Sequence, residues 1–211
     1  MARDLGPVCR ICRTEGQKLF FKGDRCFTTK CSFEKRSYWP GIHGKVKSAR
    51  LKMSDYGTQL RQKQKMRKTY GIMERQFRGY FTRALKIKGV TGIKLLQFLE
   101  SRLDNMVMRM GFTHSRAAAR QLVLHGHILV NGKKVSVPSF QLKPGMEVAI
   151  RENSTMFARC KESFQVATSR GVPDWVKVDP EKAKGVYLAL PTREQLPPDI
   201  QENMVVEFYS R

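Results

Sequence analysis

Acidic side chains are scarce in this 211-residue chain, which has 18 Asp and Glu against 40 Lys and Arg and a formal net charge of +22. No run of 18 apolar residues occurs, so the sequence predicts no transmembrane helix and no membrane partner. The opening residues Met1-Ala-Arg-Asp4 lack the apolar core of a signal peptide, and we expect a protein kept in a reducing cytosol. Five cysteines, an odd number, argue against a disulfide framework. The cation excess that remains indicates a polyanion as partner.

The positive charge is unevenly distributed along the chain. Residues 1–92 carry 23 basic and 6 acidic side chains, and residues 93–159 carry 10 and 4. Residues 160–211 are nearly neutral, with 7 basic and 8 acidic side chains. We therefore expect the polyanion to contact the first three quarters of the chain, and the last quarter to be structural or to face other proteins.

Four cysteines near the start have a spacing typical of metal ligands. They are Cys9, Cys12, Cys26 and Cys31, in the order Cys-x2-Cys-x13-Cys-x4-Cys. Two turns that each offer two thiolates can complete a tetrahedral Zn²⁺ site with no position left for water, so the pattern favours a structural zinc. An iron–sulfur cluster with the same ligands and a set of free buried thiols are the alternatives. Cys160 stands alone and is expected to be an ordinary core thiol.

The segment 36–53 is rich in cations and contains Pro40, Gly41 and Gly44, which predicts an extended arm without its own core. Its aromatic residues are Tyr38, Trp39 and His43. They would either stack on bases or fasten the arm to the protein, and the sequence favours neither.

Two helices are expected next. Ser54 and Asp55 begin the first, which should continue to about Tyr70 and end at Gly71. It has no acid after Asp55, which favours phosphate contact by its cations Arg61, Lys63, Lys65, Arg67 and Lys68. The second helix, over about 73–87, has a core stripe of Met73, Phe77, Tyr80, Phe81 and Leu85. Its cations Arg75, Arg78, Arg83, Lys86 and Lys88 should lie elsewhere on its surface.

A break at 89–92 is the expected domain junction, and a longer apolar helix is predicted from Ile93 to Met110. A helix capped by Ser115 follows and stops at Gly126. Asn131-Gly132 then predicts a tight β-hairpin. Arg116 and Arg120 share one helical face, and this stretch has no acid of its own, so we interpret it as an RNA-docking unit that also presents His125, Lys133 and Lys134. His125 and His127 have a purely structural alternative, which is favoured for His127.

The last part of the chain predicts short strands at 147–150, 175–178 and 186–190, and a strand or helix at 204–209.

Several motifs match a known fold. They are Leu99-Glu-Ser-Arg-Leu-Asp104, Arg109-Met-Gly111, Ser115-Arg116, Ala119-Arg-Gln-Leu122, His125-Gly126-His127, Val130-Asn-Gly132 and Pro138-Ser139. This segment resembles the small RNA-binding fold named after small-subunit ribosomal protein four. Further matches are the four cysteines, 38–44, Ser54-Asp-Tyr56, 60–65, Tyr70-Gly71-Ile72, 74–77, 88–92 and 206–211. With residues 160–200 matching least, nearly the whole chain is similar to the bacterial family of that ribosomal protein.

The resemblance implies an α+β fold. It places a zinc-binding segment and basic arm at 1–45, and a helical domain at 46–92 that 198–211 completes. An inserted RNA-binding domain at 93–197 would carry the helix-helix-β-hairpin module at 99–162. The implied function is that of a cytoplasmic, bacterial-type small-subunit component that binds ribosomal RNA at a multi-helix junction, starts assembly of the subunit body and contributes to translational accuracy near the messenger entry path. Implied partners are neighbouring ribosomal proteins, including protein five, and in some members their own messenger RNA. In members with four cysteines these hold structural Zn²⁺.

The expected metal ligands are Cys9, Cys12, Cys26 and Cys31. The expected RNA-binding residues are Arg50, Lys52, Arg61, Lys63, Lys65, Arg67, Lys68, Arg109, Ser115, Arg116, Arg120, Gln121, His125, Asn131, Lys133 and Lys134.

Two other classes of protein carry the same module. An RNA-modifying enzyme such as a pseudouridine synthase would need a separate catalytic domain, and only about 50 residues follow the module, which is too few. A stalled-ribosome or heat-shock RNA factor would not explain the long basic N-terminal region with its cysteines. We therefore expect a scaffold and no catalytic residues.

Overall fold

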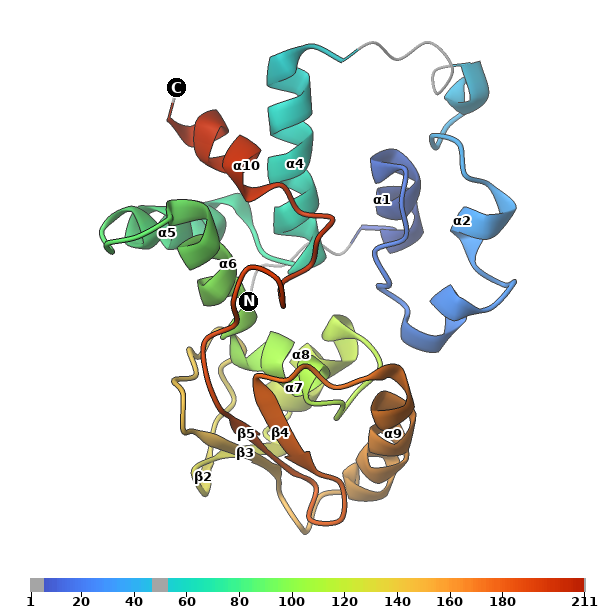
Figure 1. Cartoon of the computed structure of the whole chain (residues 1–211). Helices are drawn as coiled ribbons and strands as arrows, with labels where there is room; N and C mark the ends of the chain where they lie inside the picture. Colours follow the sequence, from blue (N-terminus) through green and yellow to red (C-terminus); the bar gives the residue numbers. More distant parts are fainter. Residues whose placement is uncertain (1–5, 47–52, 211) are drawn as a thin grey trace. The chain divides into compact units, whose positions relative to one another are not determined.

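The computed structural model describes residues 6–46 and 53–210 (Figure 1). The predicted RNA-binding residues Arg50 and Lys52 lie outside the described residues. The chain divides into two compact units, unit 1 (Met1–Gly92 with Pro198–Arg211) and unit 2 (Ile93–Pro197). The cysteine-bearing segment 1–45, which we expected to be separate, groups with 46–92 in unit 1. Among the described residues, no helix combines the length and apolar content needed to cross a membrane.

Unit 1 is helical throughout its described elements. It contains α1 (Val8–Glu15), the 3-10 helix η1 (Gly23–Phe27), α2 (Ser32–Lys35), α4 (Asp55–Thr69), α5 (Glu74–Leu85) and α10 (Glu202–Tyr209). The prediction for α4 is confirmed, because the Ser54 hydroxyl accepts the Gly57 N–H at 3.2 Å and Gly71 follows the helix with φ of 63°. The core stripe of α5 is confirmed at Phe77, Tyr80 and Phe81, which are buried. Met73 and Leu85 at its ends are exposed.

The C-terminal segment is a helix, α10, and it completes the core of unit 1. It lies beside α4 in Figure 1. The Tyr209 ring stacks on Phe81 with centroids 4.6 Å apart, and the Phe208 ring lies 5.6 Å from that of Tyr56. Gln59 Nε2 donates to Glu207 Oε2 at 2.8 Å. Residues from both ends of the chain therefore form one packed unit.

Unit 2 combines helices with an antiparallel sheet, which confirms the α+β class. Helix α6 (Thr91–Glu100) leads into α7 (Leu103–Arg109) and α8 (Arg116–Leu124), and α9 (Phe157–Arg170) comes later. The five-stranded sheet has the order β2-β1-β3-β5-β4. Its strands are β1 (Ile128–Val130), β2 (Lys133–Lys134), β3 (Glu147–Ile150), β4 (Val176–Asp179) and β5 (Lys184–Tyr187). Helices α7, α8 and α9 share one apolar core with this sheet.

The predicted hairpin is confirmed. Val130 pairs with Lys133 across the turn, and Asn131 and Gly132 have φ of 48° and 75°, as a tight two-residue turn requires. Asn131 also connects the hairpin to β3. Its Oδ1 accepts the Glu147 N–H at 2.8 Å, and its own N–H donates to the Glu147 carbonyl at 2.9 Å.

The structure of unit 2 differs from the sequence prediction in one helix, one unpredicted helix and the bounds of one strand. The single helix from Ile93 to Met110 is two helices, α6 and α7, because the chain turns at Arg102 into an extended conformation with ψ of 138°. Helix α9 was not predicted at all. The strand expected at 186–190 is β5 at Lys184–Tyr187, where Gly185 lets Met110 lie close, since a Cβ there would lie 2.8 Å from the Met110 sulfur.

Candidate RNA interface and cysteine pocket

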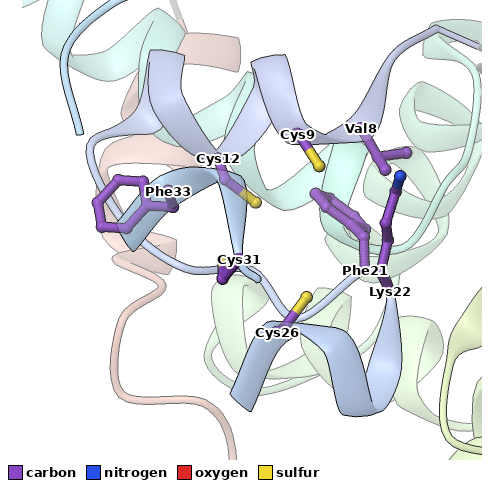
Figure 2. A pocket seen from close by; sticks show the side chains of 8 residues that line it. All are labelled: Val8, Cys9, Cys12, Phe21, Lys22, Cys26, Cys31 and Phe33. Atoms are coloured by element: carbon purple, nitrogen blue, oxygen red, sulfur yellow. The ribbon is translucent and has the colours of Figure 1, made fainter. Parts of the chain in front are cut away.

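The four cysteines of the predicted metal site line one small pocket in unit 1 (Figure 2). Helix α1 supplies Cys9 and Cys12, η1 supplies Cys26, and Cys31 directly precedes α2. Phe21 and Phe33 are among the residues that complete the lining. All five cysteines of the chain, Cys160 included, are free thiols. Residues that are 22 positions apart in sequence are thus gathered around one space, as the spacing predicts.

The Cys12 thiol is buried in this pocket. Burial raises the pKa of Cys12, and the charges of Cys26, Cys9 and Cys31 would raise it further. In the described part of the chain, no three His, Cys, Asp or Glu side chains are close enough together to form a metal site as they stand. The donor set is that of a structural zinc, but its sulfurs are not in a coordinating arrangement.

Tyr38 and Trp39 of the arm contact arginines of unit 1, as expected if these aromatic residues fasten the arm to the protein. The Arg13 guanidinium lies 5.0 Å from the Tyr38 ring centroid, and its Nε donates to the Tyr38 carbonyl at 2.9 Å. Arg61 lies over the Trp39 ring at 4.5 Å. His43 is exposed.

Two of the cations predicted to bind RNA from α4 are buried, and that assignment needs correction. Lys63 donates to Glu74 Oε2 at 3.0 Å, and Lys65 donates to the backbone carbonyl of Asp199. Their exposed fractions are only 5% and 7%, because α10 and the segment before it pack against α4. Burial lowers the pKa of Lys65, although the charges of Asp199 and Glu15 oppose this. Both lysines therefore lie in the packed interior of unit 1, where they cannot contact RNA.

The remaining α4 cations are partly exposed. Arg61 Nη1 lies 3.5 Å from Glu15 Oε1, and Arg67 Nε lies 3.8 Å from Glu74 Oε2. Lys68 is half-buried, and its charge lowers the pKa of Glu15, although burial dominates and raises it. These side chains are near the surface, but acids of the same unit already offset part of their charge.

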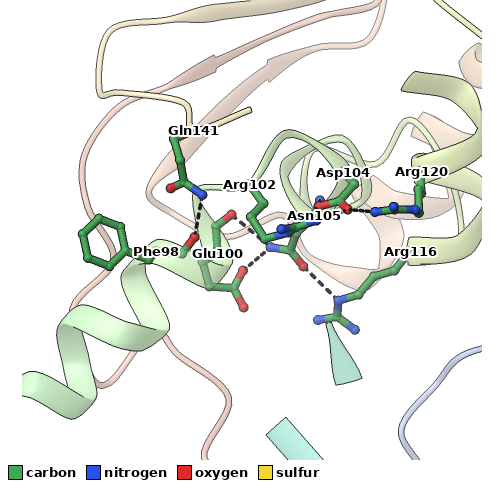
Figure 3. Close-up of polar contacts among 8 residues, drawn as sticks. All are labelled: Phe98, Glu100, Arg102, Asp104, Asn105, Arg116, Arg120 and Gln141. Atoms are coloured by element: carbon green, nitrogen blue, oxygen red, sulfur yellow. Dashed lines mark hydrogen bonds and ion pairs between the residues drawn. The ribbon is translucent and has the colours of Figure 1, made fainter. Parts of the chain in front are cut away.

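A buried polar network connects α6, α7 and α8 in unit 2 (Figure 3). At its centre is Glu100, whose side chain is fully buried. Its two carboxylate oxygens accept from Arg109 Nη2 at 2.7 Å and Nε at 2.9 Å, and Asn105 Nδ2 donates to it at 2.6 Å. The Oδ1 atom of Asn105 in turn accepts from Arg116 Nε at 2.8 Å. Two of the arginines predicted to bind RNA are thus oriented by this network, Arg109 by the Glu100 carboxylate and Arg116 by the Asn105 side chain that Glu100 holds.

A second carboxylate in this network changes the interpretation of Arg120. Asp104 accepts from Arg102 Nη2 at 2.7 Å and Nε at 3.0 Å, and from Arg120 Nη1 at 3.0 Å. Arg120 is 8% exposed, so its prediction as an RNA contact is corrected to a structural role. The stretch 115–135 has no acid of its own, and the acids that hold its arginines come from the preceding elements. Both acids, Glu100 and Asp104, lie in the motif Leu99–Asp104, so the sequence already contained the partners of these arginines.

The other predicted residues of unit 2 differ in accessibility. Gln121, His125, Lys133 and Lys134 are exposed. Ser115 is half-buried and caps α8 by accepting the Ala118 N–H at 3.3 Å. The exposed Asn131 uses its side-chain oxygen inside the hairpin, as described above. His127 has the structural role favoured for it, since its Nδ1 lies 2.8 Å from Ser154 Oγ, and burial lowers its pKa.

Comparisons with known proteins point to the same family for unit 1 and unit 2. A family model described as "Ribosomal protein S4/S9 N-terminal domain" matches residues 3–100, and one described as "S4 domain" matches residues 101–148. Proteins named "Small ribosomal subunit protein uS4" are similar over the whole of both chains. Those of Citrifermentans bemidjiense and Natranaerobius thermophilus are each 52% identical over 211 residues, and that of Geotalea daltonii is 53% identical.

Identity of this level over the full length and the two matching domain models assign the chain to a single protein family. The chain belongs to the uS4 family of ribosomal proteins, which are non-enzymatic structural components of the small subunit of the bacterial-type ribosome.

Proposed function

We propose that this protein binds small-subunit ribosomal RNA directly at a multi-helix junction and thereby nucleates assembly of the subunit body. In the mature subunit it would contribute to translational accuracy near the messenger entry path. Its family membership and its surplus of basic side chains support this proposal.

One observation supports RNA binding by unit 1. Several of its acidic side chains bind other residues of the same unit. Glu15 is 4% exposed at its side chain and contacts Arg61. Glu74 binds Lys63 and the Tyr209 hydroxyl, and Glu207 accepts from Gln59. Residues 1–92 have 23 basic and 6 acidic side chains, and two of these acids, Glu15 and Glu74, already bind cations of the unit, so the surface of this region has a large excess of cations.

Such a surface suits an RNA junction. Several phosphate backbones converge there, and their mutual repulsion opposes the compact state. A protein with cations on two units would offset this repulsion and shift the junction towards one folded arrangement. Shape and backbone contacts should dominate, because the deep groove of A-form RNA hides most base edges.

The accessible predicted residues form the proposed contact set. It comprises Arg61, Arg67, Lys68, Arg109, Arg116, Gln121, His125, Lys133 and Lys134. Arg50 and Lys52, outside the described residues, remain predictions. The set omits Lys63, Lys65 and Arg120, which are buried, and Ser115 and Asn131, whose side-chain oxygens accept hydrogen bonds in the α8 cap and in the hairpin.

Titrating the full-length protein against naked small-subunit RNA at several salt concentrations tests the proposal. Lys133→Gln with Lys134→Gln should weaken binding and reduce the slope of log K against log salt by roughly 1.4–1.8, since each lost phosphate contact removes about 0.7–0.9. Lys177→Gln with Lys182→Gln, two exposed lysines of the near-neutral region, is a control with the same change in charge. Failure of the unmodified protein to bind, or footprints scattered outside any junction, would contradict the proposal.

We also propose that Cys9, Cys12, Cys26 and Cys31 hold a structural Zn²⁺. Their location around one pocket supports this, and thiolate donors of this kind would cross-link α1, η1 and the start of α2. Because a zinc ligand must be a thiolate and burial raises the pKa of Cys12, zinc binding should release protons and weaken at low pH.

Metal analysis of the purified protein, with its absorption spectrum, separates zinc from the iron–sulfur alternative. One zinc per chain and no visible absorption are expected. Cys12→Ser should abolish the zinc, whereas Cys160→Ala should retain it because Cys160 lies in the core of unit 2. Full loading of Cys12→Ser, or a coloured protein, would contradict the assignment. RNA footprinting with and without a chelator shows whether the metal affects binding.

Neighbouring ribosomal proteins, protein five among them, and the protein's own messenger RNA complete the proposed partners. Competition between the messenger leader and small-subunit RNA for the protein tests the second of these. Mutual displacement would show one shared site.

A further inference from the structure

Helix α5 has an exposed row of cations that the predicted contact set does not include. Arg75, Arg78, Arg83 and Lys86 are all exposed, while the opposite side of the helix is buried in the core of unit 1. At 3.6 residues per turn these positions follow one face, with about one cation for every 5.4 Å of helix. We call this row the α5 basic face.

The cations of the α5 basic face are not neutralised within the unit. In the part of the chain that the structure describes, none of the four has a carboxylate partner. Glu74 is the only acid of α5, and it contacts Lys63 and Tyr209 instead. Helix α4 differs, because its Lys63 and Lys65 are buried and its Arg61 and Arg67 lie near acids. The accessible and uncompensated charge of this helix pair is therefore on α5.

A glycine lies in the middle of the same face. Gly79 falls between Arg78 and Arg83, and a Cβ added to it would meet no atom within 4 Å. Packing within the chain thus does not require a glycine here, and its backbone φ is not in the left-handed region. Glycine inside a helix lowers helix stability relative to alanine. A bare patch of backbone between cations instead allows an external surface to approach closely.

We propose that the α5 basic face is a docking surface for the sugar–phosphate backbone of an RNA strand, with Gly79 at the point of closest approach. The proposal rests on the RNA-binding function proposed above and adds a contact surface to it. Cations that repeat every helical turn without an intervening acid match the repeating negative charge of a phosphate backbone. Thr82 lies on the same face and donates its hydroxyl to the Arg78 carbonyl at 3.0 Å. Its hydroxyl is therefore used within the helix, and the arginines remain available to contact the RNA.

The charge contribution is tested with Arg75→Gln combined with Arg78→Gln in the full-length protein. Binding to naked small-subunit RNA should weaken about tenfold or more at 0.1 M salt, and the salt slope should fall by roughly 1.4–1.8. Lys177→Gln with Lys182→Gln removes the same charge far from α5 in the sequence and should change both quantities much less. If the unmodified protein binds and the two double variants bind equally well, the α5 proposal is overturned and the proposed function stands. If the unmodified protein does not bind, both are overturned.

Gly79→Ala and Gly79→Leu test the close approach separately from charge. Neither changes the net charge, so the salt slope should stay as in the unmodified protein while affinity falls, more for leucine than for alanine. Thermal unfolding should occur at the same or a higher temperature, because alanine and leucine favour the helix more than glycine does. Unchanged RNA affinity in both variants, whatever their thermal stability, would overturn the assignment of Gly79.

Discussion

Buried cations are held in different ways in the two units. In unit 2, the buried Arg102 and the partly exposed Arg109 each donate two hydrogen bonds to one carboxylate, Asp104 and Glu100 respectively, and both carboxylates are buried. In unit 1, Lys63 binds a carboxylate whose side chain is 45% exposed, and Lys65 binds a backbone carbonyl. The arginines of unit 2 are thus held by buried carboxylates, whereas the buried lysines of unit 1 bind a half-exposed carboxylate and a backbone carbonyl.

This difference indicates which substitutions should lower the stability of each unit. A buried ion pair adds little net stability when it forms, but removal of one partner leaves an uncompensated buried charge. Unit 2 should therefore be sensitive to single changes within its network. Unit 1 depends more on α10, which supplies the aromatic and hydrogen-bonding contacts around its lysines. The following changes test this contrast, in decreasing order of expected effect.

Asp104→Asn should have the largest effect. It removes the charge that binds both Arg102 and Arg120, and should cost about 3–5 kcal/mol of unfolding free energy in unit 2. Thermal or urea unfolding measures the loss, and peptide-resolved hydrogen exchange assigns it to unit 2. Lys184→Ala is a matched control, because its pair with Glu147 at 3.1 Å is 43–44% exposed and should be worth about 0–1 kcal/mol. Equal losses in the two variants would refute the contrast between buried and exposed pairs.

Tyr209→Phe should destabilise unit 1 by about 1.5 kcal/mol, since it removes the hydrogen bond that the hydroxyl donates to Glu74 at 2.6 Å. The ring stack on Phe81 is retained. Combining this change with Glu74→Gln gives a double-mutant cycle, in which the two effects should be less than additive. Strict additivity would show that the two side chains act independently, and that α10 does not stabilise unit 1 through this contact.

The N-terminal caps of α4 and α8 allow the same substitution to be compared in the two units, with a smaller expected effect. Ser54→Ala in α4 and Ser115→Ala in α8 each remove one cap hydrogen bond and should each cost about 1 kcal/mol. Hydrogen exchange should show faster opening of the first turn of the affected helix only. A loss at Ser115 that spread through the whole of unit 2 would mean that the arginine network depends on this cap.

The pH dependence of unit 1 should show the smallest effect. Burial alone would raise the pKa of Glu74, but hydrogen bonds from Tyr209 and Lys63 outweigh burial and bring its pKa below the usual value. The stabilisation by this group is therefore present above the pKa of the unfolded chain and is lost as pH falls through the lower, folded value. Unfolding curves between neutral and acidic pH should show a steeper loss for the unmodified protein than for Glu74→Gln. Parallel pH profiles would contradict this.

Local signals in the sequence predicted several elements well. The cap at Ser54 with Gly71 defined α4, and Asn131-Gly132 defined the hairpin, because both patterns act through a few neighbouring residues. The helix predicted from Ile93 to Met110 failed since the apolar spacing continues past Arg102, while the fold needs that side chain buried against Asp104. Helix α9 was missed although Cys160 and Phe164 are four apart on its buried side.

The candidate site shows a similar limit. Counting charges along the chain shows where cations are in excess, but it could not tell which of them face inward. Lys63 and Lys65 were ranked with the surface cations because their partners Glu74 and Asp199 are distant in sequence. The exposed row on α5 received no role, since the same helix also carries a conspicuous core stripe. Accessibility depends on which acids fold back onto which helix, and a single sequence contains no local sign of that.

Helix α10 also determines an order of events during synthesis. Unit 2 is continuous in sequence, so all of its residues have been added to the chain before α10 exists. Unit 1 is not continuous, and α4 and α5 must wait for α10 to cover their lysines and aromatic rings. On a translating ribosome, unit 2 can therefore fold first although it begins later in the chain, and the cation-rich N-terminal region reaches its final packing last.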